Sequence, residues 1–186
     1  MKKFKCGIVF ICLALFTTGC VASKKVGITE LKTGSQLLIR ADDSRWNGIS
    51  VPEGEQGKYC GGKDPHFPSL TFDLKGLNQQ LGSKVIGIKM YAYDINWKGG
   101  HHGKWSYEFD SDASTYTSPK IPSETKKMPE GVKGISGHTA GSKFGSGYYL
   151  APSSCVAGGG HKYFTDITLE LENGESIKTT FSQGAY

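Results

Sequence analysis

Alternation of apolar and polar residues near the C-terminus constrains the fold of this 186-residue chain more than any other feature. From Ile167 to Leu171 the apolar residues recur at every second position, the period of a half-buried strand. Asn173-Gly174 follows, a pair that indicates a type I′ hairpin turn, and residues 177–181 return as the partner strand. No window carries a long apolar stripe of helical period, so we expect antiparallel β-structure.

Two further segments have the composition of strands. Residues 85–93 are apolar at nearly every position, which predicts a strand buried on both faces. Residues 105–109 alternate aromatic and polar side chains, as a strand with one solvated face does. Shorter strands are expected at 37–39 and 70–72, a turn region at 74–81, and long loops at 42–68 and 111–140. The sequence therefore predicts an all-β fold, an antiparallel β-sandwich with long loops and little helix.

The N-terminus has the pattern of a secretory signal peptide, which we place at residues 1–19. Three lysines precede an apolar run over residues 6–16, which is shorter than the roughly 20 residues that cross a bilayer as a helix. Small residues then lead to Cys20, an arrangement that resembles the lipobox of bacterial lipoproteins. An ordinary secretory signal with an incidental cysteine is the alternative.

The lipobox resemblance implies a location for the protein. In bacterial lipoproteins the cysteine carries the lipid, palmitate included, and becomes the first residue of the mature chain. Val21 stands where retained lipoproteins have Asp, which favours the outer membrane. We therefore expect a protein of the bacterial cell envelope, anchored through lipidated Cys20 and facing the periplasm. Residues 20–35 would form a lipidated tether, and residues 36–186 fit a single domain.

The distribution of charge excludes one class of partner. The formal net charge is +5, but three of the basic residues lie in the signal segment. Without residues 1–19 the chain has 19 basic and 17 acidic residues, a net charge of +2. Because nucleic-acid-binding domains carry a marked basic excess, we expect no nucleic-acid partner.

The cysteines divide into two groups. Cys6 and Cys12 leave with the signal peptide, and Cys20 is the lipid carrier. Cys60 and Cys155 remain, and an isolated pair in an oxidising compartment predicts a disulfide. Two buried free thiols are the alternative.

Four segments resemble, in order, motifs of the phosphatidylethanolamine-binding protein family. They are Cys60-Gly61-Gly62-Lys63-Asp64-Pro65 through Phe72, Val85 to Asp94, Met128-Pro129-Glu130-Gly131-Val132, and Gly147 to Pro152 with Cys155 and His161 to Phe164. Together they span roughly residues 60–171. The resemblance implies a fold like that of the family, with a small site for an anionic ligand. The chain departs from the family at Asn96, where a second Asp is usual, and at Lys104-Trp105, where the family has His-Trp.

Five residues are candidates for the ligand site: Asp94, His101, His102, Pro152 and His161. Asp94 ends the apolar strand, where a carboxylate can bind a ligand or orient a histidine. His161 follows three glycines, whose backbone allows close approach to a small anion. Four of them have a structural alternative: a turn for Asp94, a solvated loop for the histidine pair, and a strand-start hydrogen bond for His161.

The adjacent histidines and the three tryptophans are candidates for further sites. On an extended segment the side chains of His101 and His102 point to opposite faces, so we expect no shared metal ion. No helical metal motif is present, and no cofactor is expected. Trp46, Trp97 and Trp105 could line a sugar or lipid pocket, although packing is the commoner role.

Two functions from different classes fit these features of the sequence. The first is a lipid-anchored envelope protein that binds a small ligand bearing phosphate or carboxylate. The alternative is a β-sandwich lipoprotein that acts as an interaction or assembly module for an envelope protein partner, through the loop at 111–140. An enzyme is not expected, because no nucleophile with a matching base is recognisable.

Overall fold

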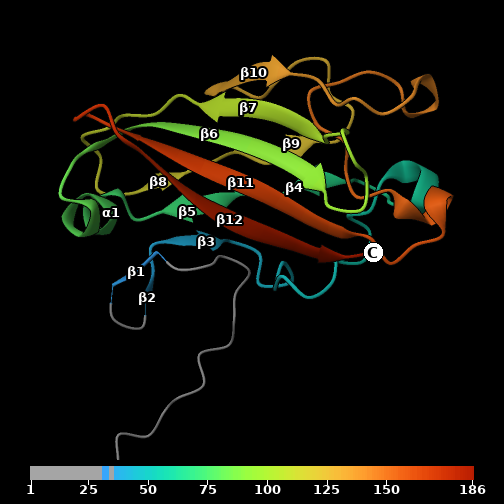
Figure 1. The fold of residues 1–186 in the computed structure, drawn as a ribbon, viewed down its shortest axis with the longest axis horizontal. Coiled ribbons are helices and arrows are strands. Elements are labelled where there is room, and N and C mark those ends of the chain that lie inside the picture. Colours follow the sequence, from blue (N-terminus) through green and yellow to red (C-terminus); the bar gives the residue numbers. More distant parts are fainter. Residues whose placement is uncertain (1–30, 34–35) are drawn as a thin grey trace, which may run out of the picture.

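The computed structural model describes residues 31–33 and 36–186 (Figure 1). The expected signal peptide, the expected lipidation site at Cys20 and most of the expected tether lie outside the described residues. No helix in the described part has the length and apolarity to span a bilayer.

A five-stranded antiparallel sheet forms one layer of the molecule (Figure 1). Its strands, in spatial order, are β10 (Val132–Ser136), β7 (Gly103–Tyr107), β6 (Val85–Asp94), β11 (Lys162–Leu171) and β12 (Ser176–Ala185). The two expected strands at 85–93 and 105–109 and the C-terminal hairpin are therefore neighbours in one sheet.

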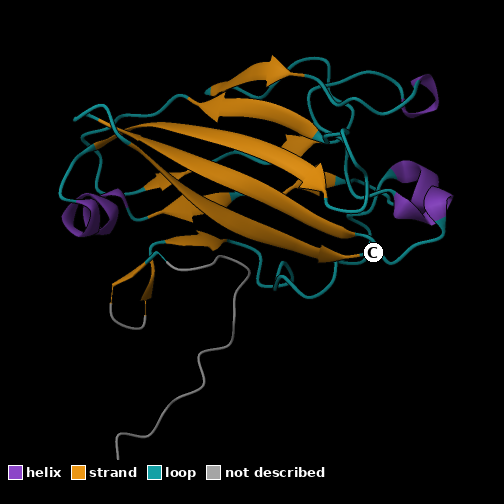
Figure 2. Ribbon diagram, viewed as in Figure 1, coloured by secondary structure: helices purple, strands orange, loops and turns teal. Residues whose placement is uncertain are grey.

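Shorter strands form the second layer, which covers the inner face of the large sheet (Figure 2). They are β3 (Ile39–Ala41), β5 (Leu70–Phe72) and β8 (Tyr116–Thr117) in one sheet, with β4 (His66–Phe67) paired to β9 (Ile121–Pro122). A separate pair, β1 (Lys32–Thr33) and β2 (Gln36–Leu37), lies below β3 in the view of Figure 1. The expected loop at 111–140 thus contributes β8, β9 and β10. The helical elements are α1 (Leu74–Leu81) and the 3-10 turns η1 (Lys58–Cys60), η2 (Ser142–Phe144) and η3 (Ser154–Ala157).

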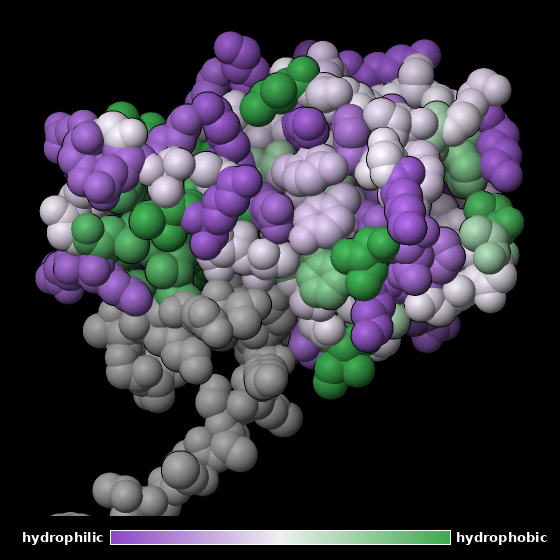
Figure 3. All heavy atoms as spheres, viewed as in Figure 1, coloured by the Kyte–Doolittle hydropathy of each residue, from purple (hydrophilic) through white to green (hydrophobic). Residues whose placement is uncertain are grey.

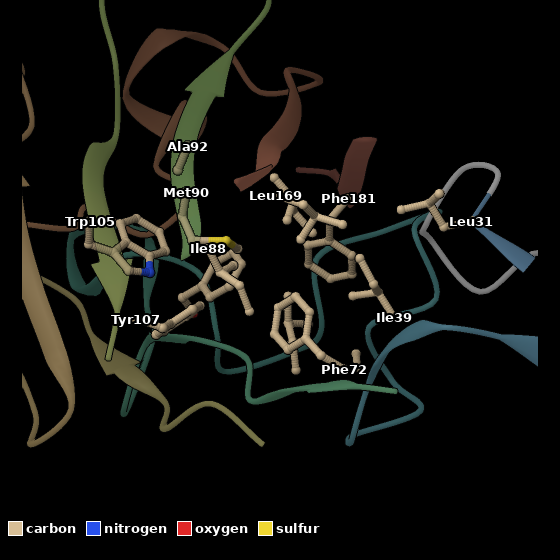
Figure 4. Close-up of a cluster of buried hydrophobic side chains, with 14 of the residues drawn as sticks. Leu31, Ile39, Phe72, Ile88, Met90, Ala92, Trp105, Tyr107, Leu169 and Phe181 are labelled. Carbon is tan, nitrogen blue, oxygen red and sulfur yellow. The ribbon is translucent and has the colours of Figure 1, made fainter. Parts of the chain in front are cut away.

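The hydrophobic core lies between the two layers (Figure 4). Phe72 of the small sheet contacts Tyr107 of the large one, with ring centroids 6.2 Å apart. Phe67 contacts Trp105 at 5.1 Å and Phe181 at 5.8 Å, edge to face in both cases. The antiparallel β-sandwich predicted from the sequence is confirmed.

The C-terminal hairpin is confirmed, but its turn is not of type I′. The N–H of Gly174 donates to the carbonyl of Leu171 at 2.9 Å, which closes a turn around Glu172 and Asn173. Gly174 has φ of +86°, whereas Asn173 does not have a positive φ. The hairpin therefore uses an ordinary turn followed by a left-handed glycine, the three-residue alternative for an Asn-Gly pair.

Two expectations about single elements were wrong. The strand β6 is buried on one face only, and Ile86 on its other side is 52% exposed. A helix, α1, stands where a turn was expected: the Asp73 carboxylate accepts from the Gly76 N–H at 2.8 Å, which caps its first turn. The burial of Leu74 and Leu77 fixes this helix to the core.

Candidate functional site

The pairing of two long strands brings Asp94 and His161 together. Asp94, the last residue of β6, lies opposite Tyr163 near the start of β11. Its carboxylate oxygen Oδ2 lies 2.6 Å from Nδ1 of His161, and Oδ1 accepts from the N–H of Asn96 at 2.8 Å. The Asp94 side chain is 5% exposed and the His161 side chain 20% exposed. Since a carboxylate requires a donor, Nδ1 carries the proton and Nε2 remains for a ligand.

His102 provides a second imidazole of fixed orientation, in the same region of the structure as that of His161. Its Nδ1–H donates to the carbonyl of Leu150 at 2.7 Å, and its ring packs edge to face on Tyr163 at 5.2 Å and on Trp97 at 5.8 Å. The residue is only 4% exposed, and this burial lowers the pKa of His102 to about 4. His102 is therefore neutral near pH 7, and its Nε2 is a hydrogen-bond acceptor.

Asp94, His102 and His161 line one cavity of about 330 Å³. Most of the remaining wall is apolar or carries hydroxyl and amide groups. The other residues that line it are Asn96, Trp97, Ala140, Gly141, Lys143, Phe144, Leu150, Ser153, Ser154, Val156, Ala157 and Tyr163. The volume falls at the small end of the range for ligand pockets, so the site suits a small molecule.

A disulfide fixes the η3 wall of this cavity. Cys60 of η1 and Cys155 of η3 are bonded, with Cα atoms 5.7 Å apart, as the sequence predicted. Figure 2 shows these helical turns at the end of the sheet opposite α1. The segment at 158–160 follows η3 and turns back toward β11 with φ values of +100°, +80° and +77°. Only glycine adopts three such conformations in a row without strain.

Two candidate residues do not line the cavity. The His101 ring packs against Tyr91 at 5.8 Å, away from His102, as expected for adjacent residues on an extended segment. Pro152 is buried, and its carbonyl accepts from the N–H of Gly57 at 2.7 Å. Of the five candidates, three therefore line the cavity: Asp94, His102 and His161.

Several residues of the cavity were missed in the sequence. Lys143 and Phe144 come from η2, within a glycine-rich loop that has no periodic pattern. Trp97 was recognised only as one of three tryptophans that could line a pocket. Of these, Trp97 lines the cavity, whereas Trp46 and Trp105 are fully buried in the core.

The two serine hydroxyls of the cavity donate to backbone carbonyls rather than to a histidine, as a nucleophile–base pair would require. Ser153 Oγ donates to the carbonyl of Ala151 at 2.8 Å, and Ser154 Oγ donates to the carbonyl of Tyr186. Neither hydroxyl donates to His161, which would be the base of such a pair.

Comparisons with protein-family models, curated proteins and solved structures find no match to this chain. Within residues 31–33 and 36–186, no group of three His, Cys, Asp or Glu side chains lies close enough to hold a metal ion. The polar chemistry of the cavity comes from one carboxylate, two imidazoles, one lysine, and the hydroxyl and amide groups of its wall.

Proposed function

We propose that the protein is a lipid-anchored component of the bacterial envelope that binds a small ligand bearing phosphate or carboxylate, on a fold like that of the phosphatidylethanolamine-binding proteins. One observation carries the ligand proposal: Asp94 and His102 line a single cavity with His161, which is 67 residues from Asp94 in the sequence. The order of the family-like motifs in the sequence supports the same assignment.

The charges around the cavity favour an anion when His161 is protonated. Asp94 then balances one imidazolium, while Nε2–H of His161 points to the ligand as a charge-assisted donor. Lys143, whose ammonium lies 5.1 Å from the centre of the Phe144 ring, adds a further positive charge at the cavity wall. The lining thus provides two cations against one carboxylate.

The acceptor nitrogen of His102 restricts which ligands would fit the cavity. Because its Nε2 accepts a hydrogen bond, the ligand should present an O–H group beside its negative charge. A monoprotonated phosphate and a hydroxy acid both meet this requirement. The apolar wall formed by Trp97, Phe144 and Val156 can take a short carbon substituent.

Titration calorimetry with inorganic phosphate, glycerol phosphate and lactate tests the ligand proposal. Asp94→Asn and His161→Asn should each weaken binding by about tenfold or more, because each removes a charge-assisted hydrogen bond. His138→Asn is the matched control, since His138 does not line the cavity. Absence of binding by the unaltered protein at about 1 mM anion, or equal binding by all variants, would contradict the proposal.

The membrane anchor has a separate test. The unaltered chain, expressed in a Gram-negative host supplied with labelled palmitate, should carry the label and sediment with outer membranes. Cys20→Ser should lose both properties, whereas Cys12→Ser should keep them. An unlabelled, soluble wild-type protein would contradict the anchor and leave the ligand proposal standing.

A further inference from the structure

The outer face of the five-stranded sheet carries an ordered pattern of charged, hydroxyl and aromatic side chains, which do not line the cavity. Strand register places its outward side chains in three rows. One row is Lys133, Ser106, Lys89, Thr168 and Lys178; the next is Ser136, Lys104, Tyr91, Asp166 and Thr180; the third is Tyr93, Phe164 and Ser182. The small sheets cover only the opposite face, so this face is turned to solvent (Figures 1 and 3).

Three aromatic rings form a continuous platform at the centre of this face. Tyr91 and Tyr93 are stacked with centroids 5.3 Å apart and an interplanar angle of 26°. Tyr93 and Phe164, opposite each other on β6 and β11, are 6.1 Å apart at 28°. Rings in nearly parallel planes offer an apolar surface on which the C–H faces of a sugar ring can pack. Figure 3 shows side chains of middling hydropathy at the centre of this face, with hydrophilic ones around them.

The polar groups beside the platform can form hydrogen bonds with the hydroxyl groups of a sugar. Oδ1 of Asp166 accepts from the Tyr93 hydroxyl at 3.2 Å and from Thr180 Oγ1 at 3.0 Å. A carboxylate has several acceptor sites, so Asp166 can also accept from a ligand hydroxyl. A carboxylate in this position is a suitable hydrogen-bond acceptor for the hydroxyl groups of a polyhydroxylated partner.

The charge of the face favours an acidic partner. Five lysines point outward from the strands against two carboxylates, Asp166 and Glu170, a formal net charge of +3. Lys104 lies over the Tyr91 ring, 4.8 Å from its centre, and Lys89 pairs with Glu170. Within the described part of the chain, no ion pair neutralises Lys133, Lys162 or Lys178. This positive field is complementary to a polyanion that lies across the strands.

We propose that this outer face binds an acidic polysaccharide, with sugar rings stacked on Tyr91, Tyr93 and Phe164 and their carboxylate or sulfate groups beside the lysines. The proposal is independent of the anion cavity, which lies at the carboxyl end of β6. It requires an extended glycan, because the rows cross all five strands.

Affinity electrophoresis of the full chain in gels containing polygalacturonate, alginate or neutral dextran tests this inference. The acidic glycans should retard the protein, dextran should not, and added salt should weaken the effect. Tyr91→Ser combined with Tyr93→Ser should raise the dissociation constant about tenfold, since two stacking contacts are lost. Tyr59→Ser is the matched control, because Tyr59 is 50% exposed and lies in η1, away from the sheet.

A second pair of variants avoids any change to ring packing. Lys133→Gln combined with Lys178→Gln should reduce retardation by acidic glycans, whereas Lys63→Gln with Lys98→Gln, off the sheet, should not. Thermal unfolding of each variant checks that it is folded. Equal retardation of all variants, or no retardation by any acidic glycan, would overturn the proposal. Tighter binding of single-stranded oligothymidylate than of any glycan would overturn it in favour of a nucleic-acid surface.

Discussion

At the scale of single residues, the hydrogen bond from His102 to Leu150 determines which hydrogen-bonding group His102 offers to the cavity. It fixes Nδ1 as the donor and so assigns Nε2 the role of acceptor. Burial makes a charged imidazole unfavourable at this position, which keeps the acceptor available near neutral pH. His161 is held differently, because its Nδ1 lies 2.6 Å from the Asp94 carboxylate.

The buried imidazole of His102 predicts acid-sensitive stability. An unfolded chain protonates this side chain near 6.5, whereas burial lowers the pKa of His102 in the folded protein to about 4. Between these values the unfolded state binds more protons, so the free energy of unfolding falls as pH drops from about 6.5 to about 4, by about 3 kcal/mol in total. Urea unfolding at both ends of this range measures the change.

His102→Asn is the matching variant, because the Asn amide can still donate to the Leu150 carbonyl but does not titrate. It should flatten the pH dependence. His101 and His138 also have pKa values lowered by burial, so a smaller slope should remain. An unchanged slope in His102→Asn would show that this imidazole is not the group responsible.

At the scale of elements, α1 depends on its cap and on two buried leucines. The Asp73 carboxylate satisfies the Gly76 N–H, one of the groups left unpaired at a helix start. Asp73→Ala should therefore lower the free energy of unfolding by about 1 kcal/mol, while Asp73→Asn should recover most of it. Denaturant titration followed by tryptophan fluorescence measures both, and equal losses in the two variants would argue against capping.

The elements that could be predicted from the sequence are the strands whose apolar and polar residues alternate, as they do when one face packs against the second layer and the other meets solvent. Strands β7 and β11 alternate because only one face meets the core. In β6 the alternation could not be recognised from the sequence. Tyr91 and Tyr93 have the apolar character of buried residues, yet they form the outward platform. The helix α1 was missed because three leucines and a capping Asp are a weak signal beside an internal glycine.

The candidate site could be predicted only in part, for a related reason. Asp94 and His161 stand at strand ends, so chain order and antiparallel pairing suffice to bring them near one another. Which of His101 and His102 faces the cavity depends on the register of β7 against β6, which the sequence does not specify. Lys143 and Phe144 reach the site through a loop whose path depends on tertiary contacts.

At the scale of the whole molecule, the disulfide joins η1 to η3 across 95 residues of sequence. Cys60→Ala combined with Cys155→Ala should lower the free energy of unfolding by about 3–5 kcal/mol, because the unfolded chain gains the freedom of a long loop. Phosphate binding should weaken as well, since η3 forms part of the cavity wall. Urea unfolding with and without reductant measures the effect.

Reductant supplies the control for that experiment. It should shift the unfolding midpoint of the unaltered protein toward that of the double variant, and leave the double variant unchanged. Identical midpoints for the two oxidised proteins would contradict a stabilising role for the bond.

Nitrogen NMR of histidine side chains, recorded while inorganic phosphate is added to the full chain, tests the central claim most directly. If one cavity unites Asp94, His161 and His102, the ring nitrogens of His161 and His102 should shift together along a single binding curve, while those of His101 and His138 stay in place. The His102 signals should remain those of a neutral ring with its proton on Nδ1. No shift at His161 or His102, or equal shifts at all histidines, would contradict the account.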